Sequence, residues 1–283
     1  MYTQEIRLPE LEGVWKWPRL VNPHLADVGA ECLDWATSFE AFTPEAQNLV
    51  HNKGKLNLLS AMCYPRMTKG GRFRAELQEP SICSFDDHAN RATTWEAYVN
   101  SVAKQAELRF NACIPDLATY FRVRRNTCGG PSTIAFYGMD MDIPDDIIDH
   151  PIICELEVLA VDLVIIKSDI LSYNKEQAVG DDEHNIITVI MREFDLNVQE
   201  AFNEAGKLSN MKIDGFYHLC HSLPQWIGPV NLDVHQLIDC MAQCVSGVMH
   251  WSYESQTYFG KGGLRIKKTR LMQLLPKVEQ IST

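Results

Sequence analysis

The segment IIDHPIICELEVLAVDLVIIKSDILSYNKEQA, residues 147–178, decides the fold that the sequence predicts. Apolar residues recur along it at alternating steps of four and three, the spacing that gathers side chains on one face of an α-helix. These residues are Ile152, Leu156, Leu159, Leu163, Ile166 and Ile170. We therefore predict a long helix whose apolar stripe packs against neighbouring helices.

Oxygen-bearing side chains lie on the other side of this predicted helix. Ser168, Ser172 and Glu176 are spaced four residues apart, so they project from one side. Separately, each serine is explained by a hydrogen bond to its own helix, and Glu176 by a surface pair with Lys175. As a set, the three suit Mg²⁺, a hard ion that keeps water ligands and binds substrate phosphate oxygens.

A second oxygen-rich cluster lies in SFDDHAN, residues 84–90. If this stretch is helical, Asp86 and Asn90 share a face, with Asp87 beside them. An isolated pair of aspartates is most often a solvated helix face or a cap. Two such clusters on separate helices instead suit metal ions bridged by an anionic substrate.

Helical periodicity dominates the rest of the chain, and alternating strand-like patterns are scarce. The further helical segments are 95–125, 182–206, 211–222 and 232–260. Interruptions such as CGGP at 128–131 and GDDEHN at 180–185 are too short for a domain linker. We predict an all-α bundle that forms one domain over residues 1–283. In GDDEHN, His184 is more simply a cap of the next helix than a general base.

Charge and cysteine content exclude several classes. A formal net charge of −11 argues against a nucleic-acid-binding protein, which needs a basic surface to neutralise phosphates. The nine cysteines are odd in number and form no CxxC pair, which indicates core residues in a reducing compartment. No stretch approaches the roughly 18 apolar residues of a membrane span. We expect an intracellular, cytoplasmic protein.

Several stretches, in order along nearly the whole chain, resemble the fungal class I terpene cyclases, in particular the sesquiterpene synthases of mushrooms. They are NPH at 22–24, CYPR at 63–66, DDHAN at 86–90, YFRVRRNTCG at 120–129, MDIPDDIIDHP at 141–151, SDILSYNKEQAVGDDEHNIITVIM at 168–191, HWSYESQTYFG at 250–260 and KKTRLMQLLP at 267–276. The stretch at 168–191 is the most specific. It is similar to the family's second metal motif, Asn-Asp-x-x-Ser-x-x-x-Glu with a Lys before the Glu.

The resemblance implies an α-helical bundle around a deep apolar pocket, with three Mg²⁺ ions at its mouth and a prenyl diphosphate, expected to be farnesyl diphosphate, as substrate. The implied product is a sesquiterpene hydrocarbon or alcohol. The implied metal ligands are Asp86, Asp87 and Asn90 from the first motif and Ser168, Ser172 and Glu176 from the second.

The resemblance also implies which residues meet the diphosphate. Lys175 would contact it, and Arg124 would act as its sensor, with Arg125 as the close competitor for that role. Tyr258 matches the Tyr of the family's C-terminal Arg-Tyr pair. The implied catalytic set is Asp86, Arg124, Lys175 and Tyr258.

Four features depart from the family. Ser168 stands where the family has Asn, Thr257 where it has Arg, and Asn90 where it has the last acid of the first motif. A few dozen residues are also missing after Asn90. These departures leave open a degenerate paralogue with weak or no cyclase activity. A chain-elongating prenyltransferase is a further alternative, although that class usually carries two matching DDxxD motifs.

Overall fold

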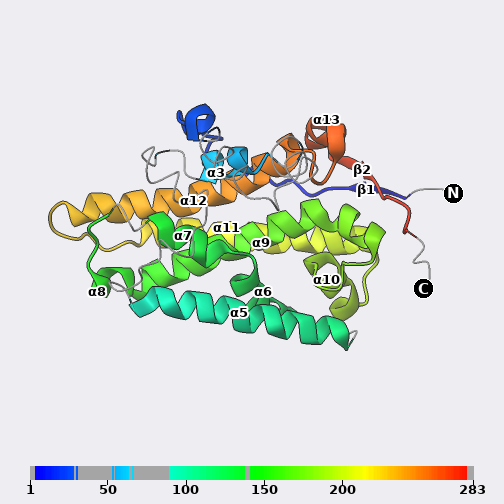
Figure 1. Ribbon diagram of the computed structural model, residues 1–283, viewed down its shortest axis with the longest axis horizontal. Coiled ribbons are helices and arrows are strands. Elements are labelled where there is room, and N and C mark those ends of the chain that lie inside the picture. The colour runs from blue at the N-terminus through cyan, green and yellow to red at the C-terminus, as the bar shows by residue number, and fades with distance from the viewer. Residues whose placement is uncertain are drawn as a thin grey trace.

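The computed structural model describes residues 4–28, 30, 53, 55–63, 66, 89–111, 113–137 and 141–278. Within them the chain is an all-α bundle, as the sequence predicts, and Figure 1 shows its long helices lying side by side. In chain order the elements are β1 (Glu5–Arg7), α3 (Leu56–Cys63), α5 (Ala89–Phe110), α6 (Leu117–Thr127), α7 (Gly130–Tyr137), α8 (Asp145–Ile148), α9 (Pro151–Val179), α10 (Ile186–Phe194), α11 (Val198–His221), α12 (Val230–Glu254), η4 (Gly260–Gly262), α13 (Gly263–Thr269) and β2 (Leu271–Gln273). None of the helices in these ranges has the length and apolar character to cross a bilayer.

Helix α9, the helix predicted from residues 147–178, lies at the centre of the bundle and packs against α6, α7, α10, α11 and α12 (Figure 1). Five residues of its predicted stripe are buried and Ile152 is half-buried. Burial extends beyond the stripe, since every residue from 159 to 174 is buried except the half-buried Ser168. A helix buried on all sides is enclosed by others, so the prediction of a single packing face understated its position.

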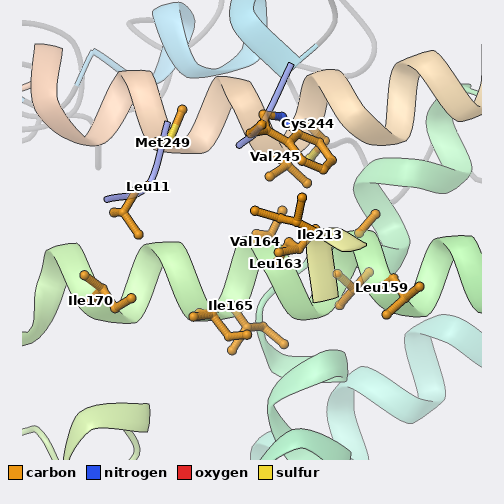
Figure 2. Close-up of a cluster of buried hydrophobic side chains, with 14 of the residues drawn as sticks. Leu11, Leu159, Leu163, Val164, Ile165, Ile170, Ile213, Cys244, Val245 and Met249 are labelled. Carbon is orange, nitrogen blue, oxygen red and sulfur yellow. The ribbon is translucent and has the colours of Figure 1, made fainter. Parts of the chain in front are cut away.

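Apolar side chains fill the space between α9 and its neighbours (Figure 2). Leu163 and Val164 of α9 lie between that helix and α12, close to Ile213 of α11. Cys244 and Val245 project toward them from α12. This packing fixes α9 between α11 and α12.

The N-terminal segment crosses the bundle and is tied to it at both ends. Strand β1 pairs antiparallel with β2, with Ile6 opposite Met272. Farther along, Nζ of Lys167, a side chain with no exposed surface, donates a hydrogen bond to the carbonyl oxygen of Leu11. Burial lowers the pKa of Lys167 to about 8, against the opposing charges of Glu12 and Glu10. A central lysine therefore holds the segment against α9.

Several predicted helical segments were wrong in their boundaries: 147–178 is interrupted at Asp149 and His150, and 232–260 extends past the end of α12 at Glu254. The segment 182–206 is divided, because Asp195 ends α10 in the left-handed region at φ 52°. Asn197 then begins α11, and its side chain and that of Glu200 form a reciprocal capping box. Helix α11 continues without a break through residues 207–210, where the sequence had suggested an interruption. The capping pattern Asn-x-x-Glu at 197–200 was the signal that apolar periodicity obscured.

The predicted segment 95–125 is likewise two helices, α5 and α6. Asp116 caps the start of α6, and its carboxylate accepts a hydrogen bond of 2.6 Å from the N–H of Thr119. Pro115 precedes this cap, which favours extended backbone before it. The turn brings α6 back against α5 and α9, so Arg124 and Arg125 of α6 reach α9.

Candidate active site

Two of the predicted metal-binding oxygens on α9 share a single hydrogen-bond donor. The amide Nδ2 of Asn185 lies 3.0 Å from Oε2 of Glu176 and 3.4 Å from Oγ of Ser172. Ser172 is buried and Glu176 is half-buried. Ser172 and Glu176, one turn apart on α9, therefore both lie next to the residue that caps the start of α10.

Burial and charge perturb the carboxyl group of Glu176. Its pKa is raised by burial and by the negative charge of Asp169, whereas hydrogen bonds from Asn185 and Ser172 and the charge of Arg124 act in the opposite direction. The carboxylates of Glu176 and Asp169 and the hydroxyl of Ser172 therefore lie close enough to interact electrostatically. This hard-oxygen donor set fits a divalent cation, which would relieve the crowding of negative charge.

Asp169 links three elements of the site through one buried carboxylate. It accepts hydrogen bonds from the hydroxyl of Tyr120 on α6 and from the N–H of Ile186, 2.9 Å away, at the start of α10. Its Oδ1 also lies 3.1 Å from Nη2 of Arg124. Burial alone would lower the pKa of Arg124, but the charge and hydrogen bond of Asp169, together with Tyr120 and Cys128, outweigh burial and raise that pKa. The guanidinium is therefore held, charged, beside the oxygens of α9.

Arg125, the competitor of Arg124, points elsewhere. Its Nε and Nη2 lie 2.6 and 2.9 Å from the two oxygens of Asp162, a carboxylate with no exposed surface. Lys212 of α11 reaches the same carboxylate at 2.7 Å. Asp162 lies two helical turns before Asp169 on α9. Of the two arginines that the sequence left open, Arg124 is paired with Asp169, and Arg125 belongs to a separate ion-pair cluster around Asp162.

Tyr258 lies near Ser168. Burial raises the pKa of Tyr258, and the nearby side chain of Ser168 acts in the opposite direction. The ring of Tyr258 also packs edge-on against Trp251, with 5.8 Å between the ring centres. Thr257 is half-buried, and its N–H donates to Oγ of Ser255. Lys175 is exposed on α9. Ser168 and Tyr258 thus belong to one cluster, with Lys175 at its solvent side.

The first predicted metal motif lies almost entirely outside the described residues. This holds for Asp86 and Asp87, and of Asn90 the structure describes only the backbone, within the first turn of α5. Among the residues that the structure does describe, no three His, Cys, Asp or Glu side chains gather as a metal site. The second motif offers one carboxylate and two hydroxyls, so it does not form such a group by itself.

Sequence reasoning missed three residues of this cluster, Tyr120, Asp169 and Asn185. The signal for Asp169 was its place beside Ser168 in the family motif, and for Asn185 its place before an apolar run, which is typical of an N-cap. The expectation that His184 caps the next helix was wrong by one residue. Asn185 is the cap of α10, and its Oδ1 accepts the N–H of Ile187 at 2.9 Å.

Comparison with known proteins assigns the family. Residues 73–214, which span both predicted metal motifs, match the family model described as terpene synthase family 2, C-terminal metal binding. The chain belongs to the terpene synthase family. This terpene synthase is 31% identical to a Delta(6)-protoilludene synthase of Stereum hirsutum over 329 residues, covering 96% of this chain and 89% of the relative. It is 41% identical to sesquiterpene synthase 1 of Postia placenta over 186 residues, covering 65% of this chain and 55% of that one.

Solved structures agree on the fold of this terpene synthase. An α-eudesmol synthase superposes with a TM-score of 0.74 at 16% identity, covering 85% of this chain and 98% of the other. A single-residue variant of cucumene synthase gives 0.72 at 18% identity, covering 85% and 99%. The class I terpene synthase fold predicted from the sequence is therefore confirmed. The 329-residue alignment with the Stereum relative is longer than this chain's 283 residues, so the relative contains residues without a counterpart here.

Proposed function

We propose that this terpene synthase ionises farnesyl diphosphate with the help of three Mg²⁺ ions and releases diphosphate and a sesquiterpene hydrocarbon or alcohol. One observation carries the proposal: buried Asp169 holds the charged Arg124 beside the Ser172 and Glu176 oxygens. An anion that bridges metal ions and a guanidinium suits such a site. The names of the fungal relatives, as sesquiterpene synthases, support a fifteen-carbon substrate.

The proposed metal ligands follow the two motifs. One Mg²⁺ ion is bound by Ser168, Ser172 and Glu176. The other ions are bound by the first-motif residues Asp86, Asp87 and Asn90. When bound, Mg²⁺ neutralises the charge of the leaving diphosphate. The hydroxyl of Ser168 has a shorter reach than the family's amide, and it lies near the Tyr258 hydroxyl. We therefore expect weaker metal binding here than with an asparagine at 168.

The remaining proposed roles concern the diphosphate. Arg124 and Tyr258 bind its oxygens, and the exposed Lys175 does so from the solvent side. As the C–O bond breaks, its electron pair leaves with the diphosphate and an allylic cation remains. A guanidinium already fixed by Asp169 stabilises the developing negative charge without reorganising. Arg125, engaged with Asp162, anchors α6 to α9 instead.

Turnover with defined substrates tests this function. Purified protein is incubated with geranyl, farnesyl or geranylgeranyl diphosphate, with and without Mg²⁺, and volatile products are identified by gas chromatography and mass spectrometry. We expect a Mg²⁺-dependent sesquiterpene from farnesyl diphosphate and loss of product on chelation. No Mg²⁺-dependent product from any of the three would contradict the proposal and favour a degenerate paralogue. A longer prenyl diphosphate as product would favour the chain-elongating alternative.

A further inference from the structure

Asn185 occupies the junction between α9 and α10, and its side chain has two separate sets of partners. The residue has no exposed surface. Its Oδ1 faces α10 and accepts the N–H of Ile187, which is the ordinary task of a helix cap. Its Nδ2 faces α9, where helix capping requires nothing. The second set of contacts therefore needs a reason of its own.

The acceptors around Nδ2 cover two turns of α9. They are the carbonyl oxygen of Asp169 at 2.9 Å, Oε2 of Glu176 at 3.0 Å and Oγ of Ser172 at 3.4 Å. An amide nitrogen carries only two hydrogens, so the three acceptors share them, and the two shortest contacts are the main hydrogen bonds. One hydrogen bond anchors the amide to the helix backbone, and the other holds the carboxylate of Glu176.

We infer that Asn185 is a positioning residue for the metal-binding oxygens of α9, an inference that rests on the proposed function. Glutamate has several rotatable bonds, and ordering a free side chain opposes the binding of an ion. A hydrogen bond to one carboxylate oxygen fixes the carboxylate before the ion arrives. Partners of this kind, one step removed from the metal, commonly change metal affinity by about tenfold to a hundredfold when they are lost.

The neighbouring residue gives the same junction a second role. The N–H of Ile186 donates to Oδ2 of Asp169 at 2.9 Å, and that carboxylate holds Arg124. The first residues of α10 thus fix both the proposed metal-binding oxygens, through Asn185, and the proposed diphosphate-binding guanidinium, through Asp169. Loss of the Asn185 amide alone removes the first of these links and leaves the second.

The test uses Asn185→Ser, which keeps a good helix cap but removes the amide donor. Asn197→Ser is the matched control, because Asn197 is also a helix cap, at the start of α11, and accepts from Glu200 there. Binding of inorganic diphosphate is measured by calorimetry at increasing Mg²⁺. We expect the Mg²⁺ concentration for half-maximal binding to rise about tenfold to a hundredfold in Asn185→Ser and to stay unchanged in Asn197→Ser.

A second substitution guards against a general loss of structure. Asn185→Thr also keeps a capping oxygen and lacks the amide donor, and it adds no charge to the site. We expect it to weaken Mg²⁺-dependent binding about as much as Asn185→Ser. Thermal unfolding of all variants shows whether a weakened fold accounts for the change.

The outcomes separate this inference from the function beneath it. If Glu176→Gln weakens Mg²⁺-dependent diphosphate binding while both Asn185 variants bind like the unmodified protein, the positioning role is overturned and the function stands. If the unmodified protein binds no diphosphate with Mg²⁺, both are overturned. A rise in the half-maximal Mg²⁺ concentration for the Asn185 variants alone, with normal unfolding, supports the inference.

Discussion

Nη2 of Arg124 lies 3.1 Å from Oδ1 of Asp169, and Asp169 is only 2% exposed. The two residues belong to different helices, α6 and α9, so this ion pair fixes their relative position at the candidate site. The carboxylate of Asp169 accepts two further hydrogen bonds, from the hydroxyl of Tyr120 and from the N–H of Ile186. Because every partner of Asp169 is itself fixed, Arg124 presents its charge in one orientation, as electrostatic stabilisation of a leaving anion requires.

Exchanging each adjacent arginine for lysine separates their roles. We expect Arg124→Lys to lower kcat/KM roughly a hundredfold, because an ammonium cannot reproduce the directed donors of a guanidinium. Arg125→Lys removes two charged hydrogen bonds to Asp162, so it should lower the free energy of unfolding by about 2 kcal/mol and leave kcat/KM nearly unchanged. Steady-state kinetics and urea unfolding measure both. A larger kinetic loss in Arg125→Lys would reverse the assignment.

Restoring the family's residue at positions 168 and 257 measures how far these two departures weaken the binding of Mg²⁺ and diphosphate. In Ser168→Asn, the longer amide should lower the Mg²⁺ concentration for half-maximal turnover several-fold, by up to about tenfold. Thr257→Arg should mainly tighten binding of inorganic diphosphate, because it adds a bidentate donor beside Tyr258. Turnover as a function of Mg²⁺ and calorimetric titration with diphosphate follow the two effects. An unmodified protein that is inactive, and a double variant that is active, would identify a degenerate paralogue.

The buried Lys167 makes stability depend on pH. The unfolded chain keeps the proton of Lys167 up to about pH 10.4, whereas the folded protein loses it near pH 8. Between these values folding releases a proton, so this lysine opposes folding below pH 8 and opposes it less as the pH rises. Relative to Lys167→Met, the unmodified protein should gain about 1 kcal/mol per pH unit from pH 8 to 10.

Urea unfolding of both proteins at a series of pH values checks this difference. Other groups whose pKa is perturbed, such as Cys220 and Cys240, are common to the two proteins and cancel in the comparison. A stability difference that does not change between pH 8 and 10 would contradict the titration of Lys167.

Close contact between α3 and α12 requires glycine at position 247. A Cβ there would lie 2.9 Å from backbone atoms of Met62 and Cys63, which cannot move aside as a side chain does. We expect Gly247→Ala to lower the free energy of unfolding by about 1 to 3 kcal/mol. Gly262→Ala is the control, since a Cβ at that position meets nothing within 4 Å. Equal thermal unfolding midpoints for the two variants would argue against the close contact.

Helix boundaries show where sequence reasoning succeeded and where it failed. The spacing of apolar residues predicted α9 and the all-α fold, because a repeat of 3.6 residues is a local property of the chain. The same spacing continued across residues 195–197, so it did not reveal the break between α10 and α11. There the backbone follows the local capping bonds of Asp195 and Asn197, which outweigh the periodicity.

The sequence by itself determined the helical class, the resemblance to the terpene synthases and the row of oxygens at Ser168, Ser172 and Glu176. The helical class and the resemblance follow from residue identity and spacing along the chain, and the row of oxygens follows from spacing along one helix. Only the tertiary structure showed that Arg124 meets Asp169 and Arg125 meets Asp162, because adjacent helical residues point about 100° apart and packing selects the partner of each. It also placed Asn185 between α9 and α10, since contacts across a turn depend on where the returning helix begins.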